Sequence, residues 1–261
     1  MRISKGPRAH LGDHFGRTSV LMTGFGPFPG VPMNATMALL PELQQAAPAL
    51  FPGLRFVSAV LATEWANAPL RLEQLLAEHR PDLVLHFGVS TRARGLEVEA
   101  RARNHRAPSP DAAGRLPAHD KCALDGAEHV ATTLPVAHIV ARLRRLGIKA
   151  FASRDAGSYL CNATLYHSLL CARAAPERRV GFIHVPAALG CRAAGIGVQA
   201  LSWEEAIAGS LEVLAVCLRP TLRPTLRPMG RASPVRLAAL RRGERPRSGL
   251  VPPARRFPSL P

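Results

Sequence analysis

The sequence predicts an α/β protein whose parallel or mixed sheet is covered by helices on both faces. Short apolar segments of strand length alternate with longer helical segments between about residues 18 and 218, and this alternation is typical of strand–helix–strand units. Within residues 82–87 (DLVLHF) the apolar positions are nearly continuous, as expected of a strand buried on both faces. A segment of this length is sufficient for one well-buried core.

Each expected strand is a short apolar run next to turn-forming residues. In chain order, the segments SVLMT, FVSAVL, DLVLHF, AFAS and VGFIHV predict strands at residues 19–23, 56–61, 82–87, 150–153 and 180–185. Residues 96–99 (LEVE) predict a sixth, more charged strand.

The helices are predicted from apolar periodicity and capping residues. We expect them at residues 34–45, 65–79, 135–146, 160–173 and 202–217. Asn34 or Thr36 is the candidate cap of the first helix. The second presents Leu70, Leu72, Leu75 and Leu76 on its apolar side. The last opens with a capping box, since Glu205 follows Ser202 by three residues.

In sheets of this kind, active sites lie beyond the carboxyl ends of the strands, so the loops there are the places to look for chemistry. The loop at residues 23–30 is rich in glycine and proline and carries Phe25 and Phe28. It lacks the Lys-Ser/Thr of a P-loop and the G-x-G-x-x-G spacing. The two phenylalanines either form an apolar pocket wall or are tucked into the core.

Cys161 is the cysteine whose local setting favours reactivity. The five cysteines are odd in number and include no C-x-x-C pair, which excludes a disulfide framework and a zinc ribbon. Cys161 follows a glycine-containing turn and lies on the first turn of a predicted helix, where the helix dipole favours a thiolate and free N–H groups can stabilise an oxyanion. Cys171 and Cys217 fall within helices.

A cysteine nucleophile needs a histidine base and a third group that orients the imidazole. His184, at the end of a predicted strand, is one candidate base, and His86 has a similar claim. The alternative for each histidine is a structural role, as a buried side chain whose hydrogen bonds are made within the core. A carboxylate from the strand at 96–99, Glu97 or Glu99, is a candidate for the third group.

Six motifs in order resemble the pyroglutamyl peptidase type I family of intracellular cysteine exopeptidases. They are T-G-F-G-P-F-P-G-x-x-x-N (23–34), H-F-G-V (86–89), E-x-x-x-x-N (99–104), T-L-P (133–135), A-G-x-Y-L-C-N (156–162) and G-F-I-H-V-P (181–186). The resemblance spans residues 18–218. It implies a three-layer α/β/α sandwich with a mixed, mostly parallel sheet, and commonly a homo-oligomer.

The resemblance also implies an activity and a site. Cys161 would be the nucleophile, His184 the general base and Glu99 the orienting carboxylate, without metal or cofactor. The implied substrate-binding residues are Phe25, Phe28, Asn34, Val89, Tyr159 and Leu160. The substrates would be peptides that carry an N-terminal pyroglutamate.

The chain departs from the family pattern around the expected pocket rim. Residues 100–103 read Ala-Arg-Ala-Arg, in which arginine replaces the apolar alternation of the family. Residues 107–111 are one residue shorter than the family pattern and lack an expected arginine. The turn at 90–92 is Ser-Thr-Arg instead of glycine-rich. These changes are expected to alter substrate choice or to reduce activity, so a catalytically impaired member that binds capped peptides is a second hypothesis.

Both ends of the chain are expected to lie outside the catalytic domain at 18–218. Residues 1–17 predict a loose extension, and residues 219–261 hold nine Pro and 11 Arg against one acid, which predicts an extended or disordered tail. Most of the net charge of +16 lies there, so a nucleic-acid-associated protein acting through a basic tail is a third hypothesis. No apolar run is long enough for a membrane span or signal peptide, so we expect a cytoplasmic protein.

Overall fold

The computed structural model describes residues 18–190 and 201–218. The expectations for residues 1–17 and 219–261 therefore lie outside the described residues. Within the described part of the chain, no helix is long and apolar enough to cross a membrane.

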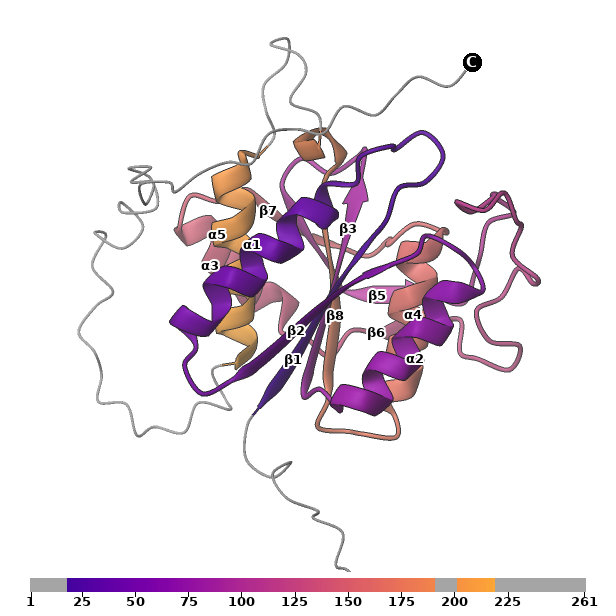
Figure 1. The fold of residues 1–261 in the computed structure, drawn as a ribbon, viewed down its shortest axis with the longest axis horizontal. Coiled ribbons are helices and arrows are strands. Elements are labelled where there is room, and N and C mark those ends of the chain that lie inside the picture. Colours follow the sequence, from indigo (N-terminus) through magenta and orange to yellow (C-terminus); the bar gives the residue numbers. More distant parts are fainter. Residues whose placement is uncertain (1–17, 191–200, 219–261) are drawn as a thin grey trace, which may run out of the picture. The chain divides into compact units, whose positions relative to one another are not determined.

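Six strands form one mixed sheet in the order β2-β1-β3-β8-β4-β7 (Figure 1). Their bounds are β1 Ser19–Phe25, β2 Arg55–Leu61, β3 Leu83–Ser90, β4 Leu96–Glu99, β7 Ala150–Ser153 and β8 Arg179–Pro186. Strands β2, β1, β3 and β8 run parallel, whereas β4 runs antiparallel to β8 and parallel to β7. The predicted mixed, mostly parallel sheet is confirmed.

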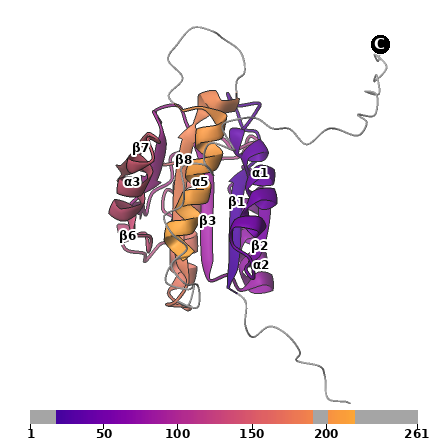
Figure 2. The same cartoon turned by 90° about the vertical axis from the view of Figure 1, so that its left-hand side faces the viewer.

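Helices cover both faces of this sheet, which confirms the three-layer sandwich (Figures 1 and 2). Helices α1 (Ala35–Leu50), α3 (Val136–Arg145) and α5 (Trp203–Leu218) pack on one face, and α2 (Asn67–His79) and α4 (Leu160–Ala172) on the other. A 3₁₀ turn, Ala187–Gly190, follows β8. Each face has its own apolar cluster, so the sheet is buried on both sides.

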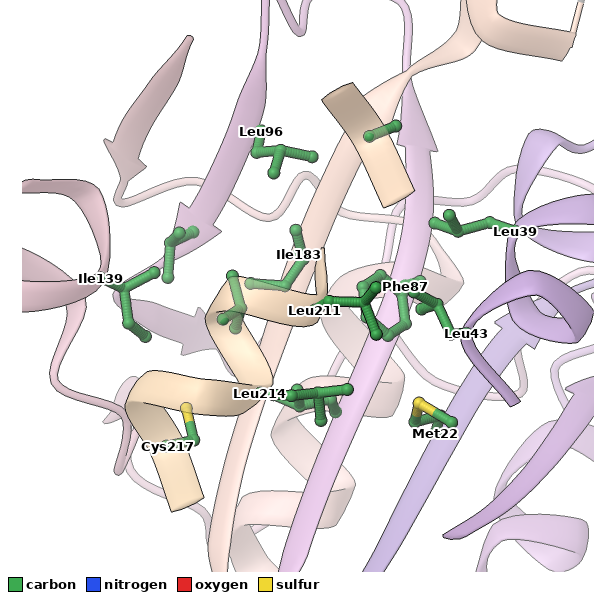
Figure 3. Close-up of a cluster of buried hydrophobic side chains, with 14 of the residues drawn as sticks. Met22, Leu39, Leu43, Phe87, Leu96, Ile139, Ile183, Leu211, Leu214 and Cys217 are labelled. Carbon is green, nitrogen blue, oxygen red and sulfur yellow. The ribbon is translucent and has the colours of Figure 1, made fainter. Parts of the chain in front are cut away.

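The larger cluster joins the sheet to the three-helix layer (Figure 3). Met22 of β1, Phe87 of β3 and Ile183 of β8 meet Leu39 of α1 and Leu214 of α5, and each of the five is 0% exposed. Burying a side chain of this size stabilises the fold by about 1.5–3 kcal/mol. This cluster holds the strands whose ends carry the site.

The capping predictions are confirmed in atomic detail. Asn34 caps α1, because its Oδ1 accepts the N–H of Thr36 at 3.1 Å. In the capping box of α5, Ser202 Oγ accepts the N–H of Glu205 at 3.1 Å while Glu205 Oε2 accepts the N–H of Ser202 at 2.8 Å. Caps of this kind stabilise a helix by about 1 kcal/mol each.

Several details differ from the sequence prediction, among them the bounds of β1, β3 and α2 by two or three residues. Leu70 is 58% exposed, because it lies about 200° around α2 from the buried Leu72 at 100° per residue. Helix α1 continues beyond residue 45 to Leu50. Two further strands, β5 (Arg101–Arg103) and β6 (His129–Ala131), pair antiparallel outside the main sheet, and each is too short to show an alternating pattern.

Candidate active site

His184 and Glu99 are brought together by the antiparallel pairing of β8 with β4. The Nδ1 of His184 lies 2.7 Å from Oε1 of Glu99, and both side chains are buried. They lie on the α2/α4 side of the sheet, because their strand neighbours Ile183 and Val98 belong to the cluster on the opposite face. Of the two candidate carboxylates, Glu99 thus contacts the histidine, while Glu97 sits level with His184 in the strand register.

Cys161 completes the group from the other side. It is the second residue of α4, and it interacts with the imidazole of His184 closely enough to shift the pKa of that histidine. Burial alone would lower the pKa of His184, but the hydrogen bonds to Cys161 and Glu99, together with the charges of both partners, raise this pKa to about 10. The imidazole is therefore held as an imidazolium at neutral pH, between two acidic groups.

The sulfur of Cys161 packs against the backbone of β3 at Gly88. A Cβ at this glycine would lie 3.0 Å from the sulfur and only 2.6 Å from Cζ of Phe182. Because Gly88 is also the strand partner of His184, this glycine leaves the space in which the side chains of Cys161 and His184 meet.

The amino end of α4 offers free backbone donors beside the sulfur. The first helical hydrogen bond runs from Ala163 N–H to the Tyr159 carbonyl, at 3.1 Å, so the N–H groups of residues 160–162 have no acceptor within the helix. These groups and the helix dipole favour negative charge at this position.

Asn162, which follows Cys161, ties the start of α4 to the segment after Glu99. Its Oδ1 accepts the N–H of Arg103 at 2.8 Å, and its Nδ2 donates to the carbonyls of Arg103 and His105 at 2.8 and 2.9 Å. The side chain is fully buried. Sequence reasoning placed Asn162 in a motif but gave it no role, because its partners lie 57 and 59 residues away.

A pocket of about 260 Å³ opens in front of Cys161 and His184. Each of the six predicted substrate-binding residues lines it, whereas Glu99 does not and lies behind the imidazole. The described lining residues are Phe25, Phe28, Val31, Asn34, Thr63, Val89, Ser90, Thr91, Arg92, Asp155, Ala156, Gly157, Tyr159, Leu160, Cys161, His184 and Ala187.

One side of the pocket is aromatic. Phe28 packs on Tyr159 with ring centroids 5.7 Å apart, and Trp65 meets Tyr159 edge-on at 5.2 Å. Phe28 is partly exposed, whereas Phe25 is 2% exposed and packs on Phe182 within the core. Both phenylalanines therefore contribute to the pocket lining, and Phe25 is at the same time buried in the core.

Asn34 lines the pocket, and its amide also holds the loop that carries the aromatic residues. Its Nδ2 donates to the carbonyl of Gly26 at 3.2 Å, and Thr63 Oγ1 donates to the same oxygen at 2.9 Å. Asn34 thus supports Phe25 and Phe28 from behind.

His86, the other candidate base, is a core histidine. It is 0% exposed and forms a 2.6 Å hydrogen bond with Thr23 Oγ1. Burial, followed by the positive charge of His167, lowers its pKa to about 3, so the ring is neutral at physiological pH.

Residues 107–111, which depart from the family pattern, support the aromatic side of the pocket through contacts with Trp65 and Tyr159. Asp111 is buried and accepts the N–H groups of Trp65, Ala113 and Arg115, each at 2.9 Å. Burial acts to raise its pKa, but these hydrogen bonds outweigh it and lower the pKa. Tyr159 donates its hydroxyl to the carbonyl of Pro110 at 3.0 Å.

Sequence reasoning did not find the ion pairs at the opposite side of the pocket. Asp155 Oδ1 accepts from Arg103 at 2.7 Å, and its Oδ2 lies 3.5 Å from Arg92. The arginines that replace apolar residues in β5 thus contact the loop before α4, since Arg101 donates to the carbonyl of Arg154 at 3.1 Å.

Glu97, Glu99 and His184 form a cluster with metal-ligand chemistry, their donor atoms lying within 4.8 Å of one another. The Nδ1 of His184 and Oε1 of Glu99 already bond to each other.

Comparison with known proteins places this geometry in one family. A family model described as pyroglutamyl peptidase matches residues 18–218. Pyrrolidone-carboxylate peptidases from Pseudomonas fluorescens and Streptococcus suis are 35% and 32% identical over 168 and 169 residues, which make up 64% of this chain and 78% and 77% of theirs.

Solved structures agree with the sequence relatives. Pyroglutamyl peptidase I from Bacillus amyloliquefaciens superposes with a TM-score of 0.69 at 26% identity, covering 77% of this chain and 96% of that one. A mutant pyrrolidone carboxyl peptidase from Pyrococcus furiosus gives 0.70 at 28% identity, covering 78% and 100%.

Proposed function

The chain belongs to the pyroglutamyl peptidase family, and we propose that it removes N-terminal pyroglutamate from peptides with Cys161 as nucleophile, His184 as acid and base, and Glu99 as the orienting carboxylate. One observation supports this most directly: a buried carboxylate 2.7 Å from the imidazole that meets a cysteine at a helix amino end. This is the arrangement that activates a thiol for acyl transfer.

In the first half of the reaction, the Cys161 thiolate attacks the carbonyl carbon between pyroglutamate and the next residue. The N–H groups at the start of α4 receive the developing oxyanion. As the C–N bond breaks, the His184 imidazolium gives its proton to the leaving amine, and the pyroglutamyl group stays on sulfur as a thioester.

In the second half, neutral His184 takes a proton from water, whose oxygen attacks the thioester carbonyl. The C–S bond breaks, pyroglutamate leaves, and the thiolate–imidazolium pair is restored. Glu99 fixes the ring so that Nδ1 faces the carboxylate while Nε2 serves the chemistry, and its charge stabilises the imidazolium in both halves.

The pocket chemistry suits a pyroglutamyl group. Pyroglutamate presents a flat, neutral lactam, and the wall formed with Phe28 and Tyr159 is apolar and aromatic. A free α-amine or a glutamate carboxylate would lose its hydration in such a wall without a partner, which disfavours uncapped peptides.

The intact catalytic group favours an active enzyme over an impaired member that only binds capped peptides. The divergent residues 100–111 keep the buried Asp111 and the supports of Tyr159. None of the divergent residues 100–111 is among the described residues that line the pocket. Of the changed segments only the turn at residues 90–92 lines it, and there it affects which peptide is accepted.

The test is release of aminocoumarin from pyroglutamyl-aminocoumarin by the purified full chain under reducing conditions, beside Cys161→Ser. Turnover by the parent with none by the variant is the expected result. A folded parent without turnover would remove the peptidase proposal and leave the binding hypothesis in its place. Glutamyl-aminocoumarin, which lacks the lactam, is the matched control and should not be cleaved.

We further propose a reducing compartment such as the cytoplasm, because the reaction needs a free thiol and the described cysteines Cys122, Cys161, Cys171 and Cys217 are all free. A homo-oligomer, suggested by the family resemblance, stays a prediction that sedimentation of the full chain would check.

A further inference from the structure

The pocket has two chemically different sides because of the strand order. Phe28 lies on the loop after β1 and Tyr159 on the loop between β7 and α4, whereas residues 91–95 connect β3 to β4 and must pass the end of β8, which lies between those strands. His184 lies near the end of β8. A substrate whose pyroglutamyl ring occupies the aromatic side therefore extends its next residue past His184 toward the connection that carries Arg92.

Arg92 is the permanent cation among the described residues that line the pocket. Its side chain is 70% exposed, and its ion-pair partner Asp155 is 47% exposed at 3.5 Å. Pairs this exposed and this long contribute little to stability, so Arg92 can exchange Asp155 for another carboxylate at small cost.

The negative charge of Asp155 does not depend on Arg92 for a cationic partner. Arg103 holds Oδ1 of Asp155 at 2.7 Å, and Asp155 Oδ1 also accepts the N–H of Gly157 at 3.1 Å. If Arg92 turns toward a ligand, Asp155 therefore keeps a close cationic partner. Because Arg103 pairs with Asp155, Arg92 is available to bind a ligand carboxylate.

The surroundings add positive charge to this side. Arg101, Arg103 and Arg154 lie together around Asp155, since Arg101 donates to the carbonyl of Arg154 and Arg103 to the carboxylate of Asp155. Two further acids lie nearby: Glu99 is bonded to His184, and Glu97 interacts with the positive charges of both His184 and Arg92. A rim with this excess of arginine attracts anionic ligands and repels cationic ones.

We propose that Arg92 binds a carboxylate on the residue that follows pyroglutamate, so that peptides with Asp or Glu at this position are the preferred substrates. The proposal rests on the proposed function and extends it to the substrate class. The planar guanidinium suits a carboxylate through two parallel hydrogen bonds.

The test compares kcat/KM for three peptides that differ at one position: pyroglutamyl-Asp, pyroglutamyl-Ala and pyroglutamyl-Lys, each followed by the same neutral sequence and an amidated end. We expect the Asp peptide to exceed the Lys peptide by roughly tenfold at low salt, and the ratio to shrink at high salt. Arg92→Gln should bring the ratio to within about twofold, and Arg92→Glu should invert it.

Arg94→Gln is the matched control, because Arg94 is exposed on the same connection but does not line the pocket. It should keep the wild-type ratio. Equal rates for the three peptides with the wild-type chain, or an unchanged ratio in Arg92→Gln, would overturn the inference while turnover of the Ala peptide keeps the peptidase activity intact. No turnover of any of the three would overturn both.

Discussion

Helix α4 contacts two cysteine–histidine–glutamate sets, and only one of them has the geometry of a catalytic group. The first set is Cys161, His184 and Glu99. The second is Cys171, His167 and Glu73, in which the imidazole lies 3.7 Å from sulfur and 2.9 Å from the carboxylate. The residue types are the same, so the differences between the sets lie in geometry and burial.

The sets differ in how the imidazole is used. His184 gives Nδ1 to Glu99 and leaves Nε2 for chemistry, whereas the same Nε2 of His167 meets both Glu73 and Cys171. The second imidazole therefore has no separate nitrogen to pass a proton between its two partners.

The sets also differ in electrostatics. Glu99 is 0% exposed, and the pKa of His184 is raised to about 10, while the Glu73 side chain is 54% exposed and the pKa of His167 is lowered by burial despite that carboxylate. Burial also raises the pKa of Cys171, which lies near the end of the helix away from the favourable dipole. A catalytic set thus needs a shielded carboxylate and a position at the amino end, beyond the right residue types.

The largest expected effect separates the two cysteines. Cys161→Ala should lower kcat/KM for pyroglutamyl-aminocoumarin by roughly a thousandfold or more, because it removes the nucleophile. Cys171→Ala, measured in the same assay, should stay within about twofold of wild type. Comparable losses of kcat/KM in both variants would contradict the claim that only the set containing Cys161 is catalytic.

A smaller effect separates the two carboxylates. Glu99→Gln should lower kcat by about a hundredfold or more, because the amide keeps the shape but neither fixes the imidazole tautomer nor stabilises its charge. Glu73→Gln should leave kcat near the wild-type value. Circular dichroism of both variants checks that the loss is not unfolding, and a fully active Glu99→Gln variant would contradict the assigned role.

The third comparison needs no substitution and concerns the pH dependence of the two histidines. His184, with its folded pKa raised from 6.5 to about 10, keeps a proton that the unfolded chain releases. Its contribution to the free energy of unfolding is full below pH 6.5 and is lost as the pH rises toward 10, by at most about 1.4 kcal/mol per pH unit. His167, with a lowered pKa, acts in the opposite sense and destabilises the fold as the pH falls below 6.5.

Imidazole NMR resonances followed from pH 5 to about 10.5 would measure both histidines in one sample. Glu99→Gln should move the His184 transition to lower pH and leave that of His167 in place. A His184 that titrates near 6.5 in the wild-type chain would show that the imidazolium is not held as described.

The elements that carry the chemistry were predictable because their signals are local. The apolar run of β3, the capping box at Ser202 and the glycine turn before Cys161 can each be recognised within about ten residues of sequence. Charged, three-residue strands such as β5 carry no such signal.

What the sequence could not settle depends on contacts between distant segments. Glu97 and Glu99 lie on the same face of one strand, and the register of β4 against β8 decides which of them contacts His184. The pairing of Arg92 with Asp155 joins residues from separate loops. Neither pairing leaves a spacing pattern in the chain. The family resemblance therefore singled out Glu99, and it marked Arg92 only as part of the divergent turn at residues 90–92, without a partner.

The contact between His184 and Glu99 joins residues 85 positions apart, and it forms only where β8 is inserted between β3 and β4. Helices and neighbouring strand pairs form early in folding, whereas contacts that close long loops form slowly. During refolding, helical circular dichroism should therefore recover ahead of peptidase turnover. The recovery of enzyme activity therefore reports when the pairing of β8 with β4, and with it the sheet, is complete.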